Sequence, residues 1–291
     1  MARVGCNLVH LSIQALFLVL SSALLHALWN ALLKREADIA TATVCVLSVS
    51  LATSALIVPF FPGPRFPTTE SVLWGLCAGA FEGGYFLTLA MALLRAPLGF
   101  AYTVARGTAI ALVFPISVIF LAERVTWLSG LGVGFLYAGL VAVGMSREQH
   151  ADPKGLFWSA VCGACVAGYH LCYKQALHAG ALAPALFTLS LAVALPINLL
   201  RHGKSAPRRV LLALRDNPRR MLLAGIACTF SFTVFLYALA LAGAGAVLTL
   251  RNTSVIFAQL LALSIGERLH ARQVLGALLV GLGAVLIGWP S

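Results

Sequence analysis

Ten apolar runs, each of about twenty residues, follow one another along the sequence and are separated by short polar links. A run of this length can cross the hydrocarbon core of a bilayer as one helix. The chain is 60% hydrophobic and only 10% charged, whereas about a quarter of a soluble domain is charged. Because backbone amides in lipid must be satisfied internally, we predict an all-α integral membrane protein with ten transmembrane helices. The runs cover residues 11–33, 39–61, 72–94, 98–121, 127–145, 155–177, 182–200, 221–241, 245–265 and 271–289.

The net charge of +11 lies mostly in the links. Seven of the twenty Lys and Arg residues fall between Arg201 and Arg220, a pattern typical of a loop retained on the cytoplasmic side. Because no aromatic-basic surface module accompanies the charge, we expect no nucleic-acid partner. Over all links, fourteen basic residues lie on the side opposite the termini and four on the side of the termini. The positive-inside rule then places both termini outside.

The two halves of the sequence match each other. Arg106 precedes Arg251 by 145 residues, and both lie inside apolar runs. Five spans per half is an odd number, so the second half must enter the membrane the other way up. We therefore predict two inverted five-helix repeats, residues 1–146 and 155–291, a design that recurs in transporters with a central site. The other matches are Glu123, Gly132, Gly139 and Gly144 with Glu267, Gly276, Gly283 and Gly288, at 144 residues, and Trp29, Asn30 and Lys34 with Tyr169, His170 and Lys174, at 140 residues.

Phe114-Pro115 followed by Leu121-Ala122-Glu123-Arg124, and Gly266-Glu267-Arg268-Leu269 in the second half, resemble the EamA family of the drug/metabolite transporter superfamily. The resemblance implies a ten-helix, multi-pass carrier that moves small metabolites by alternating access. It also implies the cell inner (plasma) membrane of a bacterium and cytoplasmic termini, which opposes the charge count, so the side of the termini stays open. The second half has Gln259-Leu260 where the first has Pro115, so a kink expected in the fourth span has no expected counterpart in the ninth.

Ionisable residues inside spans are candidates for function. Glu82 is placed near mid-membrane, Arg106 and Arg251 lie about one-third of the way into their spans, and His26 and His170 lie deeper. A structural ion pair of Glu82 with one arginine is an alternative, but one acid cannot satisfy two arginines. An unpaired guanidinium suits a carboxylate, phosphate or phosphonate. We therefore predict an anionic or zwitterionic small-molecule substrate.

The candidate residues fall into two sets. The expected substrate-binding residues are Arg106, Arg251, Trp29, Asn30, Tyr85, Tyr102, Tyr169 and Asn252, and the expected coupling or proton residues are Glu82, His26 and His170. Each of these residues could instead have a purely structural role. Glu82 lies among glycines that suit helix packing, and lone histidines or aromatic residues in spans often belong to the core. Lys34 and Lys174 near span ends are expected to reach the interface as anchors. The pairs Glu123-Arg124 and Glu267-Arg268 are expected to be structural.

These features favour a secondary active transporter, either an exporter or an exchanger. We expect no catalytic residues, since no nucleophile lies beside a base. Cys162 and Cys165 have metal-ligand spacing but lie inside an apolar run without a second pair, so we expect helix packing, no metal and no cofactor. The alternatives are an intramembrane enzyme using Glu82, His26 or His170, and a non-transporting membrane sensor or assembly protein. The expected partners are the lipid bilayer and the substrate, with the protein a monomer or homodimer.

Overall fold

The computed structural model describes residues 12–33, 35–96, 98–120, 126–144, 152–203, 206–254, 256–257, 260–261 and 271–288. All regular structure in these residues is helical, as predicted. The protein is a multi-pass membrane protein, because six described helices are long and apolar enough to cross a bilayer and three shorter ones are also apolar. The helices are α1 (Ile13–Leu33), α2 (Ile39–Ile57), η1 (Val58–Phe60), α3 (Thr69–Leu93), α4 (Leu98–Phe120), α5 (Trp127–Gly144), α6 (Pro153–His178), α7 (Ala183–His202), α8 (Ala206–Asp216), α9 (Pro218–Leu241), α10 (Ala244–Arg251) and α12 (Ala271–Gly288).

Short polar residues set several helix starts. The side chain of Asp38 accepts a hydrogen bond from the Thr41 amide at the start of α2, and Thr68 does the same at the start of α3. Asp152 caps α6, whose first residue is Pro153. Such side chains satisfy amides that have no partner inside the helix, and proline suits the first helical position. The links between the apolar runs therefore encode where the helices begin.

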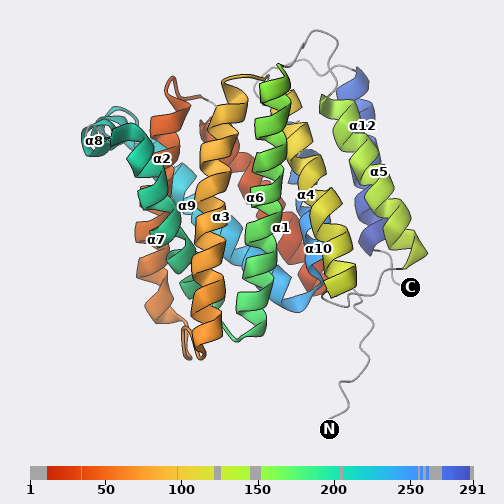
Figure 1. The fold of residues 1–291 in the computed structure, drawn as a ribbon, viewed down its shortest axis with the longest axis horizontal. Coiled ribbons are helices and arrows are strands. Elements are labelled where there is room, and N and C mark those ends of the chain that lie inside the picture. Colours follow the sequence, from red (N-terminus) through yellow and green to blue (C-terminus); the bar gives the residue numbers. More distant parts are fainter. Residues whose placement is uncertain are drawn as a thin grey trace.

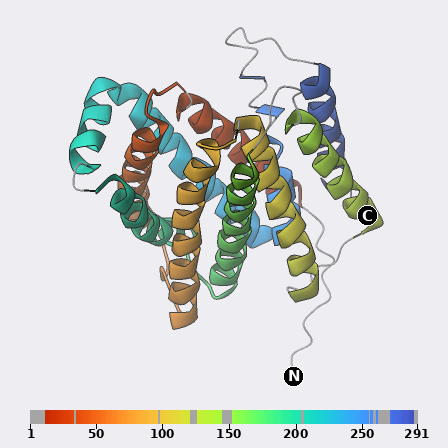
Figure 2. The same ribbon diagram turned by 45° about the horizontal axis from the view of Figure 1, so that its top comes forward.

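The most extensive packing joins helices of the first half to helices of the second half. α3 packs against α6 and α7, α9 packs against α1 and α2, and α5 packs against α12. α4 lies against α6 and α10, and α2 lies against α7. Figures 1 and 2 show α5 and α12 side by side at one end of the molecule and α8 at the other. The buried core is thus built between the halves rather than inside each of them.

Glycines bring α5 and α12 into backbone contact. A Cβ atom added at Gly132 would lie 2.7 Å from the carbonyl oxygen of Gly283, and one added at Gly139 would lie 2.6 Å from that of Gly276. The contacts advance along α5 while they recede along α12, so the two helices are antiparallel. Small residues that allow such an approach are typical of helix interfaces in membranes.

Serine side chains join α1 and α2 to α9. The hydroxyls of Ser22 and Ser231 each donate to the carbonyl oxygen of the other residue, at 2.8 Å and 3.0 Å. Ser50 on α2 donates to the carbonyl oxygen of Gly225 on α9, at 2.9 Å. Hydrogen bonds of this kind join membrane helices where no water competes. They hold α9 against both first-half helices.

One link contains a helix that we did not expect. The basic segment from Arg201 to Arg220 was interpreted as a loop, but α8 occupies residues 206–216. Its Val210 and Leu214 pack against the core, whereas Leu211 is 67% exposed. Its apolar residues form only a short run, residues 210–214, with arginines on both sides, so a search for spans overlooks it. The helix packs against α2 and α9.

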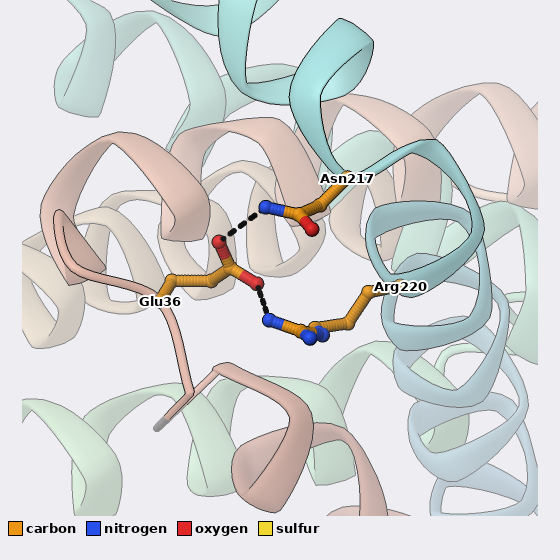
Figure 3. Close-up of polar contacts among 3 residues, drawn as sticks. All are labelled: Glu36, Asn217 and Arg220. Carbon is orange, nitrogen blue, oxygen red and sulfur yellow. Dashed lines mark hydrogen bonds and ion pairs between the residues drawn. The ribbon is translucent and has the colours of Figure 1, made fainter.

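Polar contacts between links show which of them share a side of the membrane. Glu36, between α1 and α2, forms an ion pair with Arg220 at 2.6 Å and accepts a hydrogen bond from Asn217 at 3.3 Å (Figure 3). On the opposite side, the Leu182 amide donates to the carbonyl oxygen of Arg65 at 3.0 Å. The α1–α2 link therefore lies with α8, and the α2–α3 link lies with the α6–α7 link.

Candidate substrate-binding site

Arg251 is the last residue of α10 and is 1% exposed. The central carbon of its guanidinium lies over the rings of Phe232 and Phe235 on α9, at 4.4 Å and 4.1 Å from their centroids. Aromatic faces attract a cation in this geometry. However, none of the three side-chain nitrogens has a hydrogen-bond partner among the described residues. The two rings position the charge but leave all of its hydrogen-bond donors unused.

The helix stops at this arginine. Asn252 and Thr253 form a turn, in which their amides donate to the carbonyl oxygens of Thr249 and Leu250 at 3.1 Å and 3.0 Å. The side-chain amide of Asn252 donates to Leu248 and leaves its own oxygen without a partner. This turn lies before Gln259-Leu260, the place that matches Pro115, and Gln259 itself lies outside the described residues. In contrast, α4 continues as a helix through Pro115.

The Phe232 ring is the centre of a group of aromatic side chains around Arg251. Tyr169, whose ring contacts Phe232, stacks on His170 at 4.4 Å between ring centroids. His170 in turn contacts Phe235 at 4.9 Å. Two further rings join the group at its edge: Tyr85 contacts Tyr169 at 6.0 Å, and Trp29 contacts His26 at 5.2 Å. The site therefore draws on helices of both halves. The rings in contact with Phe232 are Phe187 at 4.8 Å, Tyr169 and Phe235 at 6.4 Å, and His26 at 6.5 Å.

Arg106, the match of Arg251 in the first half, has a different environment. It is partly buried on α4, and its Nη2 lies 2.7 Å from Nε2 of His26. A guanidinium only donates hydrogen bonds, so Nε2 of His26 accepts and carries no hydrogen. Nδ1 of His26 then carries the hydrogen and has no partner among the described residues. The two matched arginines thus differ, one paired with a histidine and the other unpaired.

His170 is fully buried, and its two ring nitrogens differ. Nδ1 lies 2.7 Å from the carbonyl oxygen of Val166, one turn earlier on α6, and therefore donates to it. Nε2 has no partner among the described residues. The structure thus places His26, His170 and Arg251 around the same two phenylalanines, with polar atoms of all three still unused.

Buried polar atoms without partners are rare in native proteins, and each one needs an explanation. Within the described residues there are nine of them, and eight belong to side chains of the candidate set. Donors predominate, because Arg251 alone contributes three nitrogens and Trp29 and His26 contribute one each. The nine are His26 Nδ1, Trp29 Nε1, Glu82 Oε1, His170 Nε2, Thr233 Oγ1, Arg251 Nε, Nη1 and Nη2, and Asn252 Oδ1.

Glu82 on α3 does not pair with either arginine in the described part of the chain. It is 0% exposed, and its Oε2 lies within hydrogen-bond distance of the hydroxyls of Tyr173 on α6 and Ser190 on α7. The alternative of a structural ion pair is therefore not what the structure has. Glu82 instead joins α3 to both helices that pack against it.

The remaining candidates take various places. Asn30 donates to the carbonyl oxygen of His26 in its own helix, at 2.7 Å. The side chain of Tyr102 lies outside the described part, as do Lys34 and the two Glu-Arg pairs. Lys174 is only 6% exposed, and its Nζ donates to the carbonyl oxygens of Leu239 and Ala242 at 2.7 Å each. The prediction of an interfacial anchor is wrong for Lys174, because its ammonium group caps the end of α9.

Several residues of the site were not expected from the sequence. Phe232 and Phe235 hold the arginine, and Tyr173 and Ser190 bind the glutamate. The only signal for the phenylalanines is their spacing of three, which puts them on one face of a helix. In an apolar span that spacing is also typical of ordinary core residues, so the sequence alone does not single them out.

Comparisons with known proteins bear on the family and on the fold. Residues 153–289 match the EamA-like transporter family. The second half of the chain therefore resembles that family. It supplies Arg251, Asn252, His170 and both phenylalanines, while the first half supplies His26, Trp29 and Glu82. A crystal structure of another protein aligns with 94% of this chain and 95% of its own, with a TM-score of 0.72 and 16% identity. That likeness shows the fold alone, and no curated protein matches the sequence.

Proposed function

We propose that the protein is a secondary active transporter that moves a small anionic or zwitterionic metabolite across the plasma membrane, as an exporter or exchanger, by alternating access. The observation that carries the proposal is the buried guanidinium of Arg251, whose nitrogens have no hydrogen-bond partner among the described residues. A charged group without hydrogen bonds in a buried place is costly. A ligand that accepts those hydrogen bonds removes the cost, so the site favours such a ligand.

The chemistry of the site sets the class of substrate. A carboxylate or phosphonate accepts two parallel hydrogen bonds from one guanidinium. Trp29 Nε1 and His26 Nδ1 are further unused donors. A cation would meet two arginines and a single acid whose Oε2 is already bound to hydroxyls. A zwitterion could additionally use the free acceptors of Asn252 and His170 for its amine.

The pattern of packing supports two inverted repeats as the basis of alternating access. We match α1 to α6, α2 to α7, α3 to α9, α4 to α10 and α5 to α12. When each helix is replaced by its match, the contact α3–α6 becomes α9–α1 and the contact α3–α7 becomes α9–α2, and both of these contacts are present. The contacts α2–α7, α4–α10 and α5–α12 are unchanged by the replacement. A set of contacts that survives this exchange is what a two-fold axis in the membrane plane produces.

Close contacts follow the same exchange. A Cβ atom added at Gly79 on α3 would lie 2.7 Å from the carbonyl oxygen of Ser190 on α7, and one at Gly225 on α9 would lie 3.3 Å from that of Val46 on α2. Val46 precedes Ser190 by the repeat distance of 144 residues. The two halves can then rock about a shared interface with the site between them.

The proposal is tested by ligand-induced stabilisation of the full-length protein in lipid nanodiscs. The panel contains acetate, inorganic phosphate, methylphosphonate, neutral amino acids and alkylamines. We expect acids or zwitterions to raise the unfolding temperature of the wild type and of Arg65→Ala, an exposed arginine outside the site, but not of Arg251→Ala. Stabilisation by amines only, or by acids equally in Arg251→Ala, would contradict the proposed site. Flux of the best ligand in proteoliposomes then tests transport itself.

A further inference from the structure

Three oxygen atoms form a closed ring where α3 meets α6 and α7. Tyr173 Oη lies 2.8 Å from Glu82 Oε2 and 2.7 Å from Ser190 Oγ. Ser190 Oγ is also within hydrogen-bond distance of Glu82 Oε2. All three residues are completely buried. Each oxygen therefore has the other two as neighbours, and the three residues are shielded from solvent.

Three contacts between three oxygens need three hydrogens. The two hydroxyls supply one hydrogen each. If Glu82 were a carboxylate, one pair of oxygens would face each other without a hydrogen between them. If Glu82 is a carboxylic acid, its own hydrogen completes the ring. The acid donates to Tyr173, Tyr173 donates to Ser190, and Ser190 donates back to Glu82 Oε2.

The other carboxyl oxygen of Glu82 also indicates a protonated acid. Glu82 Oε1 is buried and has no hydrogen-bond partner among the described residues. For an ionised carboxylate this would leave half of the charge without compensation, at a cost of several kcal/mol. For the carbonyl oxygen of a neutral acid the cost is smaller, about 1–3 kcal/mol. No cation within the described residues forms an ion pair with Glu82 that would change this balance.

We infer that Glu82 is a proton-binding site and that it holds a proton in this conformation. The other titratable groups that act on it from neighbouring helices are Tyr173 and Tyr169 on α6, Cys228 on α9 and Arg251 on α10. Only Arg251 among them is a cation, and it makes no direct contact with the carboxyl group. The proton passes to water only when α3 separates from α6 and α7, because the ring is sealed while they are in contact.

The site belongs to one half only. In the repeat, the position that corresponds to Glu82 on α9 is Cys228, which follows it by 146 residues, as Gly225 follows Gly79. There the contact between α9 and α2 is made by the hydroxyls of Ser50 and Thr229 to backbone carbonyls. Glu82 therefore binds its proton without a matching acid at the corresponding position of the second half. The use of this proton to drive flux rests on the transport function proposed above, whereas the binding of the proton does not.

Infrared spectroscopy of the purified full-length protein in lipid tests proton binding without any substrate. A protonated carboxyl has a C=O stretch that a carboxylate lacks. At neutral pH we expect this band in the wild type and in Glu70→Gln, an exposed acid of the same helix, and its loss in Glu82→Gln. Tyr173→Phe removes the acceptor of the acid hydrogen, so the band should move to higher frequency. A wild type without the band, a band that survives Glu82→Gln, or an unchanged frequency in Tyr173→Phe would overturn the inference.

The role in coupling has its own measurement. Once the ligand screen provides a transported compound, its flux is measured in proteoliposomes with and without a pH gradient. We expect the gradient to change the flux several-fold in the wild type and in Glu70→Gln but not in Glu82→Gln. An equal response in Glu82→Gln would remove the coupling role and leave both the infrared result and the substrate site intact.

Discussion

At the scale of single residues, we expect the candidate site to have given up some stability of the empty protein in favour of ligand binding. Arg251 contacts two aromatic faces, but its nitrogens lack the hydrogen bonds that a buried cation needs. A residue kept for packing would not carry this cost. Binding sites often contain groups that are satisfied only when the ligand is present, and the stability of the empty protein is where this becomes measurable.

Arg251→Met tests that trade. Methionine fills a similar volume without a charge, so we expect the empty protein to become more stable by about 1–3 kcal/mol, the cost of an unsatisfied buried group. The gain should appear as a higher unfolding temperature in detergent or nanodiscs, together with loss of the response to acids. A variant that is less stable than the wild type would instead assign Arg251 a structural role.

Lys174 differs from Arg251, because its ammonium group donates hydrogen bonds to two carbonyl oxygens at the end of α9. We expect Lys174→Met to lose about 1–3 kcal/mol of stability, since both carbonyls would remain buried without a strong donor. The matched control is Lys154→Met at the exposed start of the same helix, which should change the unfolding temperature little. Equal effects of the two substitutions would show that the cap contributes nothing.

At this scale, the sequence predicts a site residue only where its chemistry differs from that of the residues around it. Arg251, Glu82 and the histidines stand out because ionisable residues are rare in apolar runs, and the structure places them together. Phe232 does not differ in this way from the apolar residues around it in the sequence, although five side chains meet at its ring. Ser190 is 108 residues from Glu82, and only the packing of α3 against α7 brings them into contact.

At the scale of elements, helices formed by long apolar runs were predictable and the others were not. Length and hydropathy are enough to locate α1 to α7, α9 and α12, because lipid permits little else for an apolar run. α8 was missed because its apolar run, residues 210–214, is far too short to cross a bilayer and has arginines on both sides. The end of α10 was missed because Arg251-Asn252-Thr253 contains neither glycine nor proline.

The antiparallel contact of α5 and α12 depends on particular glycines rather than on glycine content. A methyl group at Gly139 would meet the Val280 amide nitrogen at 2.8 Å and a carbonyl oxygen at 2.6 Å, whereas nothing lies within 4 Å of one at Gly134. We expect Gly139→Ala to destabilise the protein by about 1–3 kcal/mol. Gly134→Ala on the same helix should be neutral or stabilising by up to about 1 kcal/mol. Thermal unfolding of both variants measures the difference, and similar values would contradict the interface.

At the scale of the whole molecule, the contacts between links fix which ends of the helices share a side. Glu36, Asn217 and Arg220 lie together on one side, and Arg65 lies with the α6–α7 link on the other. The arginines of α8 belong to the first side, so from the positive-inside rule we expect that side to be cytoplasmic.

Cysteine accessibility tests this orientation. We expect a membrane-impermeant maleimide added to intact cells to label Pro64→Cys, in the exposed α2–α3 link, and to label Pro207→Cys on α8 only after permeabilisation. The unsubstituted protein, with its native cysteines, is the control. The reverse result would place α8 outside, and labelling of both sites in intact cells would contradict the arrangement of the links.

The contact between α5 and α12 also has a consequence for biosynthesis. α5 is complete at Gly144, yet the helix that its glycines fit begins only at Ala271. During translation the ribosome must add more than a hundred further residues while that face of α5 has no partner. Loop closure over such a distance is slow, so the nascent chain depends on lipid or the insertion machinery to shield the face. A message truncated before the last helix would therefore yield a product that quality-control proteases can recognise.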